Sequence, residues 1–193
     1  MTWPFLYHPG EALSDAELRS ARLDGDLVEI GEAFMPADAV ETRELRAGSL
    51  SALVGSRMAL THESAAWVHG AVPHPPRRHC VQRCVAARLH HVTDRRLCYR
   101  DVRLPVTDGM IIAGVMVTTP VRTLIDLLRD RVLRESGDDD TVRVLLAWRP
   151  DLLDETRAWL AAAGPVQFKR PARAYLDRWA SESPFVRQDD VTR

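Results

Sequence analysis

The sequence predicts a mixed α/β (α+β) protein, in which a small, mostly antiparallel sheet is flanked by helices and followed by a helical C-terminal part. Three observations support this fold class. Segments with helix caps and helical spacing of apolar residues occur near the N-terminus and in the last third of the chain. Short β-favouring clusters lie between residues 80 and 117. The stretch VTTPVRTLIDLLR, residues 117–129, changes from a strand pattern to a helix pattern.

The N-terminal segment predicts one helix followed by a β-ribbon. Ser14 and Glu17 have the spacing of a capping box, so a helix of about nine residues should follow. Apolar clusters at 27–30 and 33–35 then predict two short paired strands. A helix and a ribbon form the second half of a winged helix, and the residues before Ser14 are too few for the other two helices. Residues 1–38 are therefore predicted to be a truncated winged-helix-like element.

Residues 39–135 are predicted to form an α/β domain. Apolar spacing indicates a helix over 40–55 that is interrupted near a glycine, and a short alanine-rich helix over 62–69 that a glycine ends. The three prolines of 72–79 exclude a helix there and predict a loop. The clusters CVQRCVA, LCYRDVRL and MIIAGVMV, between residues 80 and 117, predict three or four antiparallel strands.

The strand-to-helix stretch places an arginine in an unusual position. Thr118 or Thr119 can cap the new helix, and Pro120 suits its first turn. Arg122 then lies in that first turn, near the positive end of the helix dipole, where a cation is unfavourable unless an anion or a carbonyl faces it. Asp126 follows at the i+4 position and is a candidate partner.

Residues 136–183 are predicted to form a C-terminal helical segment. It should begin with a loop and contain helices at about 140–147, 151–163 and 170–180. Residues 184–193 are predicted to be a frayed tail.

Composition points to a cytoplasmic protein. The chain has 193 residues, and no apolar run approaches the roughly 20 residues that cross a bilayer. The N-terminus lacks the pattern of a secretory signal. Three cysteines, an odd number, argue against a disulfide framework and for a reducing compartment.

The net charge of −1 conceals an uneven distribution. Residues 1–56 carry four arginines against ten acids, residues 57–134 carry thirteen against six, and the rest carry nine basic residues against eleven acids. A basic centre between acidic flanks indicates either nucleic acid or an acidic protein as a partner.

Several side chains could bind a metal or catalyse a reaction. His79, Cys80, Cys84 and Cys98, with His90 and His91 nearby, match no common zinc spacing, so no metal or cofactor is expected, although the ligand types leave a site open. His62, Glu63, Ser64 and His69 suggest a catalytic group, but Ser64 is rotated by about 200° from His62 on a helix. A helix cap at Thr61 or His62 with an inward-packed alanine face is the preferred interpretation.

The most basic stretch, RRHCVQRCVAARLHHVTDRR, is equally consistent with a solvated sheet face and with an electrostatic footprint for DNA. The candidate DNA-binding residues are Arg19 and Arg22 of the first helix and Arg77, Arg78, Arg83 and Arg88 of this stretch.

Two stretches together resemble a known family. LTHESAAWVHGAV, residues 60–72, resembles the L-S-x-x-S-A-A-x-x-H-G segment of the AbiEi-like antitoxins of type IV toxin–antitoxin systems. GVMVTTPVRTLIDLLR, residues 114–129, resembles the G-x-x-V-T-x-x-x-R-T-x-x-D-L segment of that family. Their order and spacing also agree. The resemblance extends over about residues 15–129.

The resemblance implies a non-enzymatic DNA-binding autorepressor with an antitoxin domain, whose partner is a nucleotidyltransferase-like toxin. The residues that match the family pattern are His62, Ser64, Ala65, Ala66, His69, Gly70, Thr118, Arg122, Thr123, Asp126 and Leu127. Within it we expect Arg122 to be a scaffold residue that ties its helix to the sheet, or to the turn at 64–70, through Asp126 and nearby carbonyls.

Two alternatives stay open. The same fold could act only as a protein-interaction module that has lost DNA binding, because the predicted first helix and ribbon are acidic. A metal-dependent nuclease is less favoured: the available carboxylates are Glu63, Asp94, Asp101, Asp108 and Asp126, but the sole lysine, Lys169, has no acidic neighbour of the kind that nuclease cores use.

Overall fold

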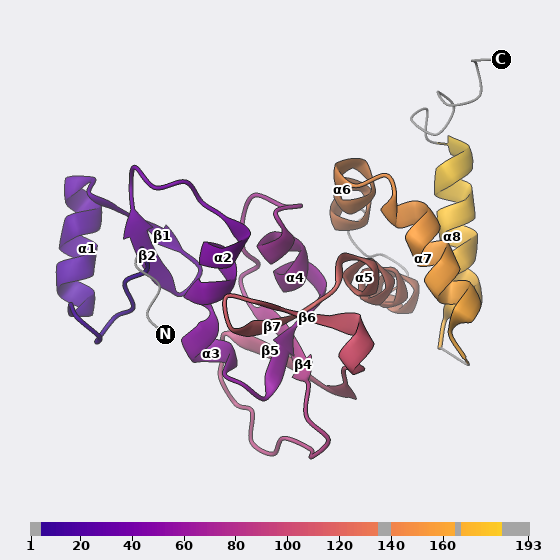
Figure 1. Cartoon of the computed structure of the whole chain (residues 1–193), viewed down its shortest axis with the longest axis horizontal. Helices are drawn as coiled ribbons and strands as arrows, with labels where there is room; N and C mark the ends of the chain where they lie inside the picture. Colours follow the sequence, from indigo (N-terminus) through magenta and orange to yellow (C-terminus); the bar gives the residue numbers. More distant parts are fainter. Residues whose placement is uncertain (1–4, 135–139, 165–166, 183–193) are drawn as a thin grey trace. The chain divides into compact units, whose positions relative to one another are not determined.

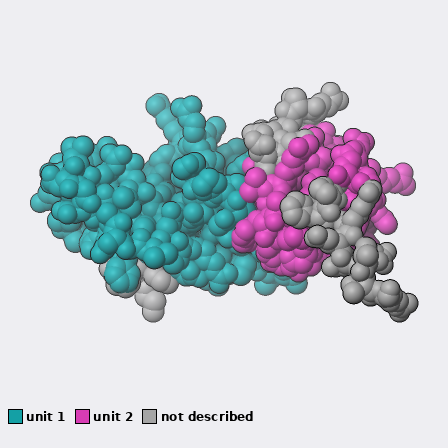
Figure 2. All heavy atoms as spheres, turned by 90° about the horizontal axis from the view of Figure 1, so that it is seen from above, with its two compact units in different colours: residues 1–120 teal, residues 121–193 magenta. Residues whose placement is uncertain are grey.

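The structure is a computed structural model that describes residues 5–134, 140–164 and 167–182. The chain divides into two compact units, residues 1–120 and 121–193 (Figure 2). No helix in the described ranges is long and apolar enough to cross a membrane. The mixed α+β class is confirmed, with one two-stranded and one five-stranded sheet and helices at the C-terminal end.

The first unit contains both sheets (Figure 1). Its elements are α1 (Asp15–Asp24), β1 (Leu27–Ile30), β2 (Ala33–Pro36), α2 (Arg43–Ser49), α3 (Ser51–Val54), β3 (Met58–Leu60), α4 (His62–His69), β4 (His79–Arg83), β5 (Leu97–Arg103), the 3-10 turn η1 (Val106–Asp108), β6 (Gly109–Ile112) and β7 (Val115–Thr118). The second unit begins within the first turn of α5 (Pro120–Arg134) and continues with α6 (Asp140–Trp148), α7 (Leu152–Ala162) and α8 (Lys169–Glu182).

The N-terminal helix and ribbon form as the sequence predicts. The capping box closes α1, since the Ser14 hydroxyl accepts from the backbone N–H of Glu17 at 3.3 Å and Glu17 Oε2 accepts from the N–H of Ser14 at 2.8 Å. Leu18 of α1 packs with Leu27 and Phe34 of the antiparallel ribbon β1–β2. Within the described residues a single helix precedes the ribbon, so a winged helix stays a prediction.

The five-stranded sheet has the order β5-β4-β3-β7-β6. It is mixed rather than mostly antiparallel, because β3–β4 and β6–β7 are antiparallel pairs whereas β4–β5 and β3–β7 are parallel pairs. The connection 84–96 is long enough to bring β5 back beside β4 in the same direction, since parallel neighbours need about a dozen linking residues.

The central strand of the sheet, β3, was not predicted from the sequence. It spans three residues, Met58–Leu60, and pairs with both β4 and β7. Ala59 and Leu60 are completely buried. Leu60 also begins the first family-like segment, and β7 belongs to the second. The pairing of β3 with β7 therefore joins the two segments in the sheet.

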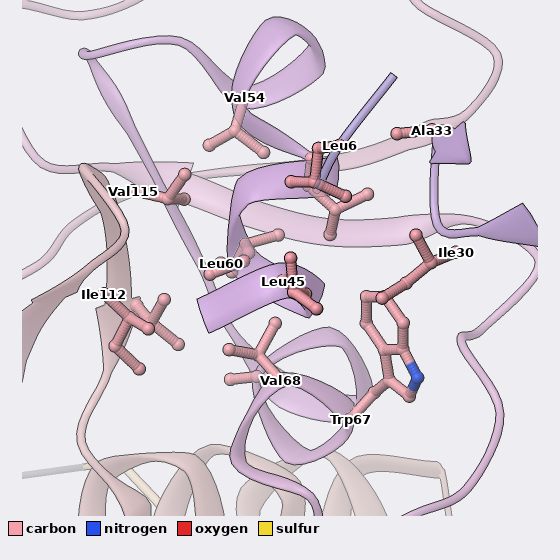
Figure 3. Packing of buried hydrophobic residues seen from close by; sticks show 14 of the residues in the cluster. Leu6, Ile30, Ala33, Leu45, Val54, Leu60, Trp67, Val68, Ile112 and Val115 are labelled. Atoms are coloured by element: carbon pink, nitrogen blue, oxygen red, sulfur yellow. The ribbon is translucent and has the colours of Figure 1, made fainter. Parts of the chain in front are cut away.

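One face of the sheet packs against α2 and α4. Figure 3 shows this core, to which the strands contribute Leu60, Ile112 and Val115, α2 contributes Leu45, and α4 contributes Trp67 and Val68. Ile30 and Ala33 of the ribbon belong to the same cluster, so the N-terminal element and the sheet share one core.

The helix predicted over 40–55 is interrupted, as expected, but later than Gly48. Thr42 caps α2, its hydroxyl accepting from the N–H of Leu45 at 3.3 Å. The break between α2 and α3 falls at Leu50, which has φ −97° and ψ 0°. Because Leu50 is fully buried, its side chain still contributes to the core at the break.

The second unit is helical. Pro120 is the first residue of α5, as the sequence predicts, and α7 packs against both α6 and α8. The predicted helices at 140–147, 151–163 and 170–180 correspond to α6, α7 and α8 within one or two residues. The predicted loop lies mostly, and the predicted tail entirely, outside the described residues.

Candidate functional site

The first family-like segment forms α4, which is buried along nearly its whole length. Of its eight residues, only Glu63 is not buried. His62 begins the helix with φ +52°, a conformation that residues other than glycine rarely adopt. Thr61 occupies the cap position, but its side chain makes no capping hydrogen bond; its Oγ1 lies 2.9 Å from His62 Nδ1 instead.

Ser64 connects α4 to the neighbouring strand β4. Its hydroxyl accepts from the backbone N–H of Cys80 at 2.9 Å and lies 3.4 Å from Nδ1 of His79. Burial lowers the pKa of His79, with a smaller opposing effect of Glu32, so the neutral imidazole is favoured. Ser64 has no exposed surface, and a buried hydroxyl cannot reach a substrate as a nucleophile. These contacts favour the structural interpretation of this residue.

His69 connects the two family-like segments. Its Nε2 lies 2.7 Å from the carbonyl oxygen of Thr118, at the end of β7, and therefore donates to it. Gly70 follows with φ +90°, and its N–H donates to the carbonyls of Ala66 and Trp67, ending the helix. The pattern residues His69, Gly70 and Thr118 are thus brought together in one unit of the protein.

Arg46 of α2 holds the end of α4, which the sequence analysis missed. Its Nη1 donates to the carbonyls of Trp67 at 2.6 Å and Val72 at 3.0 Å, and its Nε pairs with Glu41 at 2.6 Å. The guanidinium carbon lies 5.4 Å from the centre of the Trp67 ring system. No local pattern distinguishes Arg46 from the charged residues Arg43 and Glu44 of the same helix.

The thiols of Cys80 and Cys98 are register partners on adjacent parallel strands, so both project from the same face of the sheet. Cys80 Sγ donates to Oε2 of Glu63 at 3.4 Å, and burial together with this carboxylate raises the pKa of the thiol. Cys84 instead contacts the carbonyl of Ser56. Among the described residues, no group of three histidine, cysteine or acidic side chains is placed to hold a metal ion.

Arg122 and Asp126 form an ion pair within α5. Arg122 Nε lies 2.9 Å from Asp126 Oδ2, and both side chains are less than a tenth exposed. Arg129 approaches the other carboxylate oxygen at 3.6 Å. The guanidinium carbon of Arg122 also lies 6.0 Å from the ring centre of Trp159 in α7. Asp126 is therefore the anion that the helix position of Arg122 required.

The candidate DNA-binding arginines of α1 are paired within the N-terminal element. Arg19 contacts Asp15 at 2.8 Å, and Arg22 contacts Glu29 of β1 at 3.4 Å. Figure 1 shows α1 at the far end of the first unit from β4, so these two arginines and those near β4 do not form one cluster.

The arginines near β4 are also largely engaged. Arg83 and Arg88 share Asp101, at 3.0 and 3.3 Å, and Arg78 donates to the carbonyl of Leu97 at 2.5 Å. Arg77 is exposed, and its side chain makes no hydrogen bond or ion pair with a described residue. Of the six candidates, Arg77 is therefore the one whose charge is fully available to a ligand.

The carboxylates considered for a nuclease are separated by the fold. Asp94 pairs with Arg96, Asp101 with Arg83 and Arg88, and Asp126 with Arg122, whereas Glu63 accepts from Cys80. Asp108 is buried at the end of η1, directly before β6. The described residues therefore contain no carboxylate cluster suited to a metal.

We expect His69→Ala to lower the free energy of unfolding by roughly 2 kcal/mol, because it leaves the Thr118 carbonyl without this donor and removes buried side-chain volume. The melting temperature should fall by about 6 °C for a chain of this size. His74→Ala, at an exposed loop position, is the matched control and should melt like the wild type. Equal melting of both variants would contradict this role of His69.

We expect Arg122→Ala to lower the free energy of unfolding by about 3 kcal/mol, because it removes the cation that lies 2.9 Å from the buried carboxylate of Asp126. Arg129→Ala should cost less than about 1 kcal/mol, since Arg129 is more exposed and its contact is longer. Urea denaturation of both variants measures the difference. A smaller loss in Arg122→Ala than in Arg129→Ala would refute the proposed scaffold role.

The comparison with known families agrees with the two segments described above. Residues 58–149 match the family model described as the AbiEi antitoxin C-terminal domain, a range that contains α4, β7 and most of the family-pattern contacts. No curated protein matches the chain. Residues 58–149 of this chain are therefore similar to the C-terminal domain of the AbiEi antitoxins.

Proposed function

We propose that this chain is the antitoxin of a type IV toxin–antitoxin pair, acting in the cytoplasm without catalysis. It counteracts a nucleotidyltransferase-like toxin encoded beside it and represses their common operon. The match of residues 58–149 to the antitoxin domain carries the proposal. The hydrogen bond from His69 to Thr118 supports it, because it joins the two segments on which the family resemblance rests.

The buried position of the polar residues in α4 favours a non-catalytic role. Ser64, His69 and Thr118 are each engaged in contacts that hold the fold together, and none has more than a tenth of its surface exposed. A catalytic group has to contact its substrate, whereas an antitoxin can act through any exposed surface of a stable scaffold.

Co-expression with the neighbouring gene tests the antitoxin role. Induction of the nucleotidyltransferase-like protein alone should arrest growth, and induction of this chain beside it should restore growth. A version of this gene with an early stop codon is the control, because it keeps the transcript but not the protein. Growth arrest that persists although the full chain accumulates in soluble form would exclude the antitoxin role.

Repression of the operon requires DNA binding, for which the basic segment around β4 is the best candidate. Arg77 is exposed there and free of ion pairs, whereas the acidic residues of α1 and β1 neutralise Arg19 and Arg22. Phosphate contacts are made by cations that are not already paired within the protein. We therefore assign DNA contact to the segment around β4 rather than to the helix–ribbon element.

A mobility-shift titration with the operon's own upstream duplex and a scrambled duplex, at two salt concentrations, tests this part. The own duplex should bind more tightly, and Arg77→Ala should weaken binding to both duplexes and reduce the salt dependence. Arg19→Ala is the matched control and should change little, since Arg19 is paired with Asp15. If the chain binds neither duplex, the repressor role is excluded and toxin binding remains as its function.

A further inference from the structure

A second candidate site lies apart from the family-pattern residues, between two loops of the first unit. It is a pocket of about 530 Å³, a size typical of small-molecule sites. One wall is the segment 54–58, which leads from α3 into β3, and the other is the segment 89–94 of the loop between β4 and β5. None of the residues assigned above to DNA contact or to the family pattern lines it.

Three basic side chains line this pocket without partners. Arg57, His90 and His91 are exposed, and the side chain of each makes no hydrogen bond or ion pair with any described residue. This differs from the arginines around β4, which mostly pair with carboxylates or carbonyls. One guanidinium and two imidazoles that line the same hollow without an internal partner are suited to donate hydrogen bonds to an anion.

The acidic residue in the lining does not neutralise this charge. Asp94 is held by Arg96, whose Nη2 and Nε lie 2.7 and 3.1 Å from its carboxylate oxygens. These hydrogen bonds lower the pKa of Asp94 to about 2, so it stays ionised and committed to Arg96. Arg96 also contacts Glu32 at 2.6 Å, which fixes this ion-pair group to the ribbon turn.

The backbone on the loop wall has an unusual conformation. His91 has φ +62°, which costs energy for a residue with a side chain. Its side chain is exposed, so burial in the core does not account for that conformation. Gly55 on the opposite wall has φ +63°, which glycine adopts freely. Strained positions of this kind occur preferentially at ligand sites.

The remaining lining residues provide apolar surface for a ring and hydroxyl groups for polar contacts. Met58, Leu89 and Val92 are partly exposed and supply apolar surface, and Ser56 and Thr93 supply hydroxyls. A phosphate beside a flat heterocycle on a hydroxylated sugar matches this combination. The pocket volume accommodates one such unit, whereas a duplex requires an open surface.

We propose that this pocket binds the phosphate group of a free mononucleotide, with Arg57, His90 and His91 contacting the phosphate oxygens. The proposal does not depend on the antitoxin role, because it rests only on the pocket and its unpaired basic side chains.

Calorimetric titration of the full chain with pyrophosphate, ATP and GTP tests the proposal. At least one nucleotide should bind, and Arg57→Ala should weaken its affinity by about tenfold or more, which is the usual effect of losing a charge-assisted hydrogen bond. His90→Ala with His91→Ala should weaken it further. Because all three side chains are exposed, these variants should melt like the wild type.

Arg95→Ala is the matched control, since Arg95 is an exposed, unpaired arginine of the same loop that does not line the pocket. Its affinity for the nucleotide should equal that of the wild type. Absence of binding to all three probes, or equal losses in Arg57→Ala and Arg95→Ala, would overturn the site. Tighter, Arg57-dependent binding of a single-stranded oligonucleotide of about a dozen nucleotides would overturn the assignment to a free mononucleotide.

Discussion

The burial of α4 is the constraint on which the rest of the first unit depends. A helix surrounded by protein has no water to satisfy a hydroxyl or an imidazole, so Ser64 and His69 need partners inside the fold. The Ser64 hydroxyl accepts from the N–H of Cys80, and His69 donates to the carbonyl of Thr118. These bonds hold the helix to β4 and β7 at the same time. The sheet order, which places β3 between those two strands, makes both contacts possible.

Arginine makes most of the polar links between segments that are distant in the sequence. Arg46 reaches the carbonyls at the end of α4, and Arg96 joins the ribbon turn to the loop before β5. The planar guanidinium can serve several acceptors at once, which a lysine ammonium does less well. Most arginines in the basic centre of the sequence are therefore paired inside the protein. The excess of arginines over acids in this region overstates the positive charge that is available to a ligand.

The parts of the structure that depend on local spacing could be predicted from the sequence. The capping box of Ser14 and the Arg122–Asp126 pair follow from separations of three and four residues, and both form. The strand Met58–Leu60 could not be predicted, because three residues carry no periodicity. The direction of β5 and the partner of His69 depend on long-range pairing that no local pattern encodes. The pocket beside Arg57 likewise joins two loops that are far apart in the chain.

The residues that match the family pattern and the residues that could contact a partner are different sets. Ser64, Thr118 and Thr123 have no exposed surface, so a toxin or an operator cannot contact them. The pattern therefore identifies the scaffold of the antitoxin domain and does not identify its binding surface. A macromolecular partner can contact only exposed side chains, such as that of Arg77, which lies outside the two family-like segments. Variants at the buried positions act through stability, and only variants at the exposed positions can separate recognition from folding.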